Sequence, residues 1–140
     1  MEERGEVLIK ATNINQSFDV GDEAIDVLRD VNFEISHNSF NVIYGVSGSG
    51  KSTLLNIITG LQKPSKGTIL FKNQDIYKLK PDDLARFRAS RIGIIYQQNY
   101  WVQSLTVVEN VALPLYFLGY NRALALEMAM ISLERIDMQS

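Results

Sequence analysis

Apolar and polar positions in the first third of the chain follow the pattern of half-buried β-strands. Val7–Ile14 is a short apolar run, and Val31–Ile35 alternates strictly between apolar and polar residues. Between them, Asn15–Asp26 is rich in Asp, Asn, Ser and Gly, which is typical of a loop or a hairpin connection. Phe40–Tyr44 is a brief apolar run that is predicted as a buried strand. The region before residue 40 is therefore expected to be antiparallel β structure.

The later part of the chain contains helical patterns. Apolar residues at 54, 55, 57, 58 and 61 predict a helix over Ser52–Leu61, and Asn121–Ile136 is rich in the helix formers Ala, Leu, Met and Glu. Thr106–Glu109 fits a capping box, which opens a helix that Pro114 is expected to kink or shorten. Pro81 and the two aspartates after it predict another helix start, because acidic residues suit the positive end of the helix dipole.

Short apolar runs between these helices predict further strands, over Thr68–Lys72 and Ile92–Tyr96. Strands that alternate with helices favour an α/β arrangement. We therefore predict an α/β fold that is preceded by an antiparallel β region.

Composition narrows the class of protein. The 140 residues are 46% hydrophobic and 21% charged, as in globular domains, and the absence of cysteine excludes disulfides and thiolate chemistry. The single histidine, His37, argues against a His-rich metal site and is expected in a solvated turn. The net charge of −2 comes without a basic block, so no nucleic-acid partner is expected. No apolar run approaches the roughly 18 residues of a membrane span, and the acidic start is unlike a signal peptide, so we expect a cytoplasmic protein without direct membrane insertion.

One segment carries recognisable chemistry, and it fits the pattern G-x-x-x-x-G-K-[ST] in full: Gly45-Val46-Ser47-Gly48-Ser49-Gly50-Lys51-Ser52. The glycines let the loop curl, so that successive backbone N–H groups form a nest for phosphate oxygens. The helix that starts after the loop adds the positive end of its dipole. Lys51 supplies a charge for the β- and γ-phosphates, and the Ser52 hydroxyl is a candidate Mg²⁺ ligand. A chance match to a glycine-rich turn is expected on the order of once in a few hundred chains of this length.

The residues around this loop resemble a particular class of phosphate-loop protein. A small GTPase needs an Asn-Lys-x-Asp motif, which this sequence lacks. Instead, the chain resembles the front half of an ABC transporter ATPase subunit, most closely the lipoprotein-release and macrolide-export branch. The matching segments lie at Phe18, Val27–Phe33, Tyr44–Leu55, Lys66–Gly67, Ile92–Gln97 and Leu105–Leu115. They span nearly the whole chain.

The resemblance implies a set of nucleotide and metal contacts. ATP or ADP is expected on the loop residues Gly45, Val46, Ser47, Gly48, Ser49, Gly50, Lys51, Ser52 and Thr53. Phe18 falls where the family has an aromatic side chain, more often tyrosine, that stacks on adenine; the alternative is an ordinary core or surface aromatic. Gln97 takes the position of the family's glutamine that contacts Mg²⁺ beside Ser52, although Gln98 and Gln103 lie close enough for a one-residue misassignment.

The same resemblance implies a partner. Asn99–Leu105 matches the surface where such subunits meet a transmembrane permease subunit, so Tyr100 and Trp101 are candidate partner contacts, with ordinary packing as the alternative. A subunit of this kind would lie in the cytoplasm, peripheral to the inner face of the membrane.

Three later motifs of the family are not found in these 140 residues: the Leu-Ser-Gly-Gly-Gln signature, the Walker B strand and the switch histidine. The resemblance therefore implies a phosphate-loop NTPase (RecA-like) core that is truncated within the helical subdomain and has no complete catalytic set. The expected limits are residues 1–40 for the β region, 41–98 for the core and 99–140 for the start of the helical subdomain.

Several functions remain open from the sequence. The first hypothesis is the ATP-binding portion of an export ATPase, inactive in hydrolysis by itself; the alternatives are a stand-alone nucleotide-binding or regulatory module, and a remnant or fragment with no independent role. Because the Walker B strand would pair near Phe40–Tyr44 and Ile92–Tyr96, these runs are expected to leave open edges. The apolar arc of the helix expected over Asn121–Ile136 is too broad for one solvated helix, so it is a second surface on which another chain could pack. We therefore also predict self-association.

Overall fold

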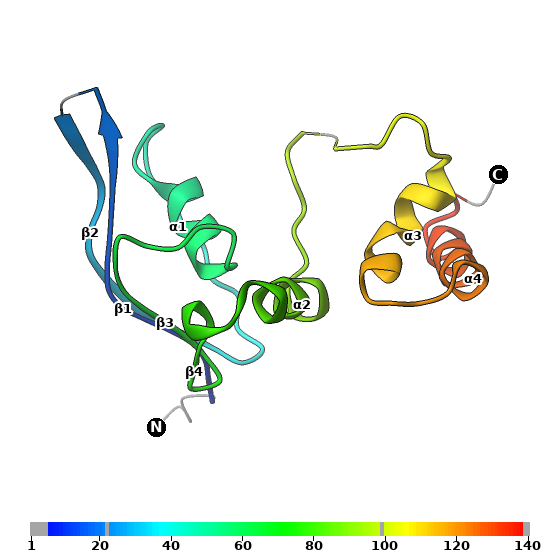
Figure 1. Ribbon diagram of the computed structural model, residues 1–140, viewed down its shortest axis with the longest axis horizontal. Coiled ribbons are helices and arrows are strands. Elements are labelled where there is room, and N and C mark those ends of the chain that lie inside the picture. Colours follow the sequence, from blue (N-terminus) through cyan, green and yellow to red (C-terminus); the bar gives the residue numbers. More distant parts are fainter. Residues whose placement is uncertain (1–5, 22, 99, 139–140) are drawn as a thin grey trace. The chain divides into compact units, whose positions relative to one another are not determined.

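A long hairpin forms one side of a four-stranded antiparallel sheet. In the computed structural model, which describes residues 6–21, 23–98 and 100–138, β1 (Val7–Val20) pairs with β2 (Glu23–Ser36). The opposite edge of β1 pairs with β3 (Lys66–Phe71), and β4 (Gln74–Asp75) gives the order β2-β1-β3-β4 (Figure 1). The predicted N-terminal antiparallel region is confirmed.

The hairpin is longer than the sequence pattern indicated. The composition of Asn15–Asp26 predicts a loop or a hairpin connection, but pairs such as Phe18 with Ile25 continue the ladder to Val20 and Glu23. Residues 18–21 and 23–26 are exposed, so the polar composition of this segment belongs to a solvated ribbon rather than to a loop. The sequence pattern does not predict the short strand β4, although Lys72 (φ 47°) and Asn73 (φ 65°) form the two-residue turn before it.

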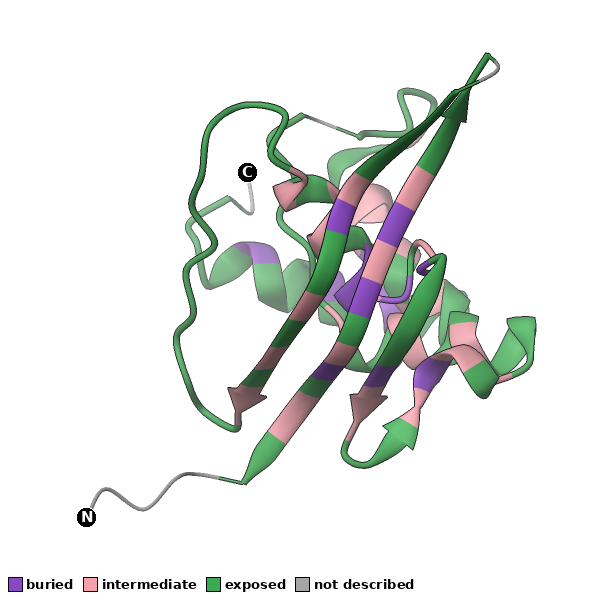
Figure 2. Ribbon diagram, turned by 90° about the vertical axis from the view of Figure 1, so that its left-hand side faces the viewer, coloured by how far each residue is buried: buried purple, intermediate pink, exposed green. Residues whose placement is uncertain are grey.

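The helix α1 (Lys51–Ile58) belongs to the same unit as the sheet. Figure 2 shows buried positions in purple along the strands, spaced between exposed ones. The 3₁₀ turn η1 (Ile76–Lys78) follows β4, and the Tyr77 hydroxyl donates to the Ile57 carbonyl at 2.6 Å, which ties η1 to the end of α1. The buried apolar residues of this unit are Ala11, Ile14, Leu28, Ile57, Ile58, Ile69 and Ile76.

Two predicted strands are wrong. Neither Phe40–Tyr44 nor Ile92–Tyr96 has strand structure, and Phe40, Tyr44 and Ile95 are at least 90% exposed. A strand is stable only when neighbouring strands take up its backbone N–H and C=O groups. Within the described residues the sheet consists of β1–β4 alone, and it gives these two runs no partner.

Residues Ala85–Ser140 form the second compact unit, after a first unit that runs from Met1 to Leu84. The helix α2 (Pro81–Arg91) crosses the boundary between them and carries two aspartates in its first turn, as predicted. In the second unit, α3 (Val107–Phe117) packs beside α4 (Arg122–Glu134) through small buried residues: Ala112, Ala125 and Ala129 (Figure 1).

The predicted capping box at the start of α3 is confirmed, because Thr106 and Glu109 bond reciprocally. Pro114 lies inside α3, yet the helix continues to Phe117. His37 is exposed in the turn after β2, as predicted. Among the described residues, the helices are too short or too polar for any of them to cross a bilayer.

Candidate functional site

The glycine-rich segment forms a tight loop that runs directly into α1. Residues 46–50 are bends and turns, with the Ser49 N–H bonded to the Val46 carbonyl at 3.3 Å. Gly50 sits at the N-cap of α1 with φ 86°, a left-handed conformation that L side chains rarely adopt. A Cβ at Gly50 would also lie 2.9 Å from Leu28 Cδ2 and 3.1 Å from the Val27 carbonyl oxygen. Glycine is thus required both by the turn and by the close approach of β2.

Lys51 folds back over this loop. Its Nζ donates to the carbonyls of Gly45 at 3.0 Å and Val46 at 2.6 Å, and it lies 3.4 Å from Ser49 Oγ. The ammonium group is therefore held at the loop by uncharged carbonyl partners. An anion with full negative charge competes well against such neutral acceptors.

The start of α1 faces a shallow depression of about 280 Å³, which is lined by Val27, Gly48, Gly50, Lys51, Ser52 and Thr53. Gly50 has no side chain that caps the helix, so the positive end of the helix dipole is open on this side. Ser52 is exposed at the same place. The arrangement offers backbone N–H groups, a cation and a hydroxyl to one anionic ligand.

Val27 is a lining residue to which the sequence pattern gave no role. Between the pairs Gln16–Leu28 and Ser17–Asp26, β2 contains one more residue than β1, which makes Val27 a bulge. Its side chain and its carbonyl approach Gly50. The bulge is visible only in the strand register, because a valine within a β-rich run gives no sequence signal for a bulge.

Phe18 lies on the same hairpin, near its tip. It pairs with Ile25, and its side chain is 41% exposed. Phe18 is two residues beyond Gln16, which pairs with Leu28, the residue that packs against Gly50. Residues two apart on a strand share a face, so Phe18 is on the face that meets the loop. The structure thus places Phe18 and Gly45–Thr53 within one unit.

Gln97 belongs to the second unit, where it is exposed in a bend that follows residues 92–96. That Gln97 contacts Mg²⁺ together with Ser52 remains a prediction. Asn99 lies outside the described residues, whereas Gln98 and Gln103 are exposed.

Three exposed aromatic side chains gather in the second unit; we call Tyr96, Tyr100 and Trp101 the aromatic surface. The rings of Tyr96 and Tyr100 meet edge to face with centroids 4.9 Å apart. Together with Gln98, Asn110 and Leu113, the three line a depression of about 320 Å³. Exposed aromatic residues that flank a depression are typical of protein interfaces.

Polar contacts hold the chain beside this surface against the helices. The side-chain nitrogen of Asn110 lies 3.0–3.1 Å from the carbonyl oxygens of Val102, Leu105 and Thr106, which share its two N–H donors, and its oxygen accepts from the Val102 N–H at 2.9 Å. Such a set of contacts fixes the segment 102–106 on the first turn of α3. The sequence pattern did not indicate the role of Asn110, since the residue follows the capping box without belonging to it.

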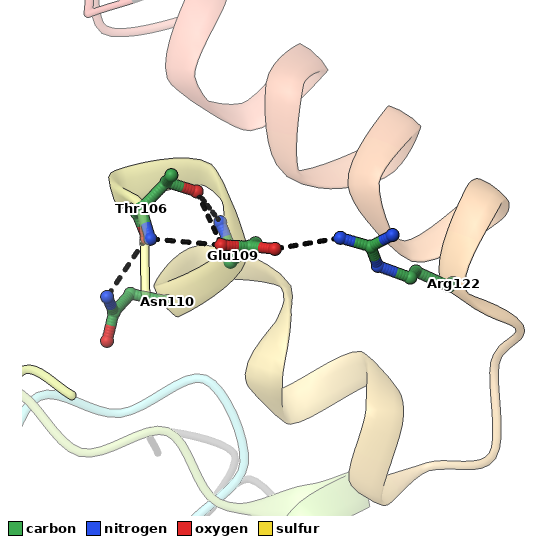
Figure 3. A network of polar contacts seen from close by, with 4 residues as sticks. All are labelled: Thr106, Glu109, Asn110 and Arg122. Carbon is green, nitrogen blue, oxygen red and sulfur yellow. Dashed lines mark hydrogen bonds and ion pairs between the residues drawn. The ribbon is translucent and has the colours of Figure 1, made fainter. Parts of the chain in front are cut away.

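Glu109 links the same turn to α4. It accepts from the N–H and hydroxyl of Thr106 at 3.0 and 2.9 Å, and from Arg122 at 2.9 Å (Figure 3). Hydrogen bonds from Thr106, followed by the one from Arg122, lower the pKa of Glu109 below its ordinary value. The pKa of Arg122 is raised by the same pair.

No group of three or more His, Asp or Glu side chains lies in a position to cage a metal ion within the described part of the chain. Mg²⁺ does not require such a cage in nucleotide sites, because phosphate oxygens and waters supply most of its ligands. The exposed Ser52 hydroxyl, which follows Lys51 in the chain, could supply one oxygen ligand in a site of that kind.

Comparisons with known proteins agree on one family. The profile described as ABC transporter matches residues 28–140. The chain is 37% identical over 133 residues to the lipoprotein-releasing system ATP-binding protein LolD of Shewanella oneidensis, covering 95% of this chain and 58% of that protein. It is 38% identical over 115 residues to the macrolide export ATP-binding/permease protein MacB of Salmonella typhimurium, covering 82% of this chain and 18% of that protein.

Solved structures give the same result for the fold. The dimeric, post-hydrolysis structure of the ATP-binding cassette MJ0796 bound to ADP and Pi superposes with a TM-score of 0.82 at 37% identity. The match covers 91% of this chain and 56% of that one. The uncharacterized ABC transporter ATP-binding protein of that name in Methanocaldococcus jannaschii is 42% identical over 110 residues, covering 79% of this chain and 47% of that protein. The chain thus spans about half the length of these matched cassettes.

Proposed function

The chain belongs to the ABC transporter family, and from that premise we propose that its first unit binds magnesium ATP or ADP on Gly45–Thr53. The observation that carries the proposal is the loop at the start of α1, where Lys51 and the uncapped helix end face one depression. A phosphate chain there would replace the neutral carbonyls that Lys51 now contacts. The ADP and Pi bound to the MJ0796 cassette support the same ligand class.

The rest of the proposed site follows the family. Phe18 supplies an aromatic face for the adenine ring. Ser52 and Gln97 are the proposed magnesium ligands, and the ion would shield the charge of the phosphate groups. The limits 1–40, 41–98 and 99–140 remain our proposal for the domain parts.

We further propose that this nucleotide site serves export. As part of a complete cassette, it would couple ATP binding and hydrolysis to transport across a membrane, in the manner that the names LolD and MacB indicate for those proteins. The aromatic surface would contact a permease subunit, with the cassette peripheral to the inner face of the membrane. The support is the exposure of Tyr96, Tyr100 and Trp101 beside a depression.

The 140-residue chain on its own is expected to bind nucleotide without turning it over. Phosphoryl transfer depends on positioning and charge stabilisation by several groups, and the signature, Walker B and switch-histidine residues are not among these 140. Steady phosphate release at about one per second or faster, surviving repurification, would contradict this expectation.

Calorimetric titration with magnesium ATP tests the binding proposal. Lys51→Ala should lower the affinity at least tenfold, because it removes a charge-assisted contact to phosphate. Lys63→Ala is the matched control, since Lys63 belongs to the same unit and lies outside the loop. Equal affinities of the parent and Lys51→Ala would overturn the proposal. Binding by the parent with no turnover would fit both the ATPase portion and a stand-alone binding module, and a restored ATPase activity after supplying the later motifs would favour the former.

A further inference from the structure

Four polar side chains link the two strands in the middle of the β1–β2 hairpin by hydrogen bonds. We call these four residues the bulge network: Asn13, Asn15, Asp30 and Asn32. Asn13 Nδ2 donates to Asp30 Oδ1 at 2.6 Å, and the Asn13 N–H donates to Asn32 Oδ1 at 2.8 Å. The Asp30 N–H donates to Asn15 Oδ1 at 3.0 Å. Side chains thus take over backbone bonds that a regular ladder would supply.

This network marks two bulges, one on each strand. Between the pairs Ala11–Phe33 and Ile14–Val31, β1 contains one more residue than β2; before the next pair, Gln16–Leu28, β2 contains one more than β1. Asn13 (φ 51°) and Asp30 (φ 46°) both adopt the left-handed conformation, which Asn and Asp tolerate better than most residues. Opposite them, a Cβ on Gly67 would lie 2.4 Å from the Asn13 carbonyl oxygen, so β3 is adapted to the bulge.

The extra residue at Asn13 decides which face each later side chain of β1 occupies. Ala11, Ile14 and Gln16 are buried, an odd residue followed by two even ones, whereas regular alternation from Ala11 would bury residues 13 and 15. A one-residue slip moves every following side chain to the other face of a sheet. Without the bulge, Ser17 would take the face that Phe18 now has.

That face is the one covered by the phosphate loop and its helix. Phe33, paired with Ala11, lines a cavity together with Leu54 and Ile58 of α1. Leu28, paired with Gln16, packs against Gly50. Phe18 continues this face by two residues beyond Gln16.

We propose that the bulge network, centred on Asn13, is the positioning element that puts Phe18 on the phosphate-loop face of the hairpin and so aligns the base subsite with the phosphate subsite. The inference rests on the proposed nucleotide site and deepens it. The role given to Asn13 is one of positioning: it acts through the register of β1 and not by contact with the nucleotide.

The test compares two ligands by calorimetric titration of the full chain: magnesium ATP and magnesium inorganic triphosphate, which has no base. Phe18→Ala should weaken ATP binding about tenfold, the scale of one base–aromatic stack, and leave triphosphate binding unchanged. Asn13→Val, which cannot hold a left-handed φ, should reproduce this selective loss. The double variant should lose no more than either single variant.

Two controls separate positioning from general damage. Asn73→Val makes the same substitution at another left-handed asparagine (φ 65°), in the turn before β4, and should leave the ratio of the two affinities at the parent value. Asn13→Gly adopts positive φ freely and should restore the ATP affinity that Asn13→Val loses. If Asn13→Val does not fold, Asn32→Ala, which removes the acceptor of the Asn13 N–H, is judged by the same ratio.

Equal losses for both ligands, or no loss, in the folded Asn13 or Asn32 variant would overturn the inference. If the parent chain binds ATP through Lys51 and Asn13→Val binds it with the same affinity, the inference is overturned and the proposed function stands. A parent that binds neither ligand would overturn the proposed function and the inference with it.

Discussion

The removal of one hydroxyl, in Tyr77→Phe, should loosen the far end of α1, the helix that carries the candidate loop at its start. The Tyr77 hydroxyl lies 2.6 Å from the Ile57 carbonyl oxygen and also contacts the carbonyl of Gln62. It has one proton and therefore donates to one of the two at a time. Because the Ile57 carbonyl also accepts from the Gly60 N–H at 3.2 Å, it is not orphaned by the change. The cost should therefore be that of one net hydrogen bond, about 1 kcal/mol, rather than the ~3 kcal/mol of a stranded buried group.

Hydrogen exchange with mass spectrometry measures this locally. A loss of about 1 kcal/mol should speed exchange roughly fivefold at the amides that close the end of α1, those of Thr59, Gly60 and Leu61. Tyr100→Phe is the matched control, since its ring is 71% exposed and its hydroxyl is 3.5 Å from Gln98. Unchanged protection at the end of α1 in Tyr77→Phe, or an equal effect in Tyr100→Phe, would refute the reasoning.

Three further predictions concern the second unit. Glu109→Gln should lower the thermal midpoint at pH 7, and the difference from the parent should shrink as the pH falls below about 4.5. The reason is that a carboxylate whose pKa is lowered by folding stabilises the folded chain above its ordinary pKa of 4.5 and loses that effect as it is protonated. A difference that is constant with pH in circular-dichroism melts would contradict this. Asn110→Leu should release segment 102–106 and increase acrylamide quenching of Trp101, the only tryptophan; unchanged quenching would mean that Asn110 does not hold the segment. The parent should self-associate, and Ile131→Glu, on an exposed apolar position of α4, should reduce this in light scattering after size-exclusion chromatography; a parent that is a 15.8 kDa monomer over a tenfold concentration range would disprove it.

Features governed by neighbouring residues were predictable from the sequence. The capping box at Thr106–Glu109 and the aspartates in the first turn of α2 depend on contacts within one helical turn, and the structure has both. The glycine-rich loop was recognisable for the same reason, since its residue types are required by the backbone conformations of a short stretch of chain.

Features governed by distant partners were not predictable in this way. Phe40–Tyr44 has the composition of a strand, but strand structure depends on what lies alongside it, and β1–β4 leave it unpaired among the described residues. Conversely, Asn15–Asp26 has the composition of a loop, yet pairing across the hairpin makes most of it strand. The bulge at Asn13 could not be predicted because an asparagine is compatible with a left-handed conformation (φ 51° here) but does not determine which face the following side chains take.

Backbone amide shifts of the nitrogen-15-labelled chain, recorded while magnesium ATP is added, test the central claim most directly. The account predicts the largest shifts at the amides of Gly48, Gly50, Ser52 and Thr53, which line the depression at the start of α1, and their loss in Lys51→Ala. Shifts absent from these four amides at saturating nucleotide, or unchanged by Lys51→Ala, would contradict the claim that this loop holds the phosphate groups.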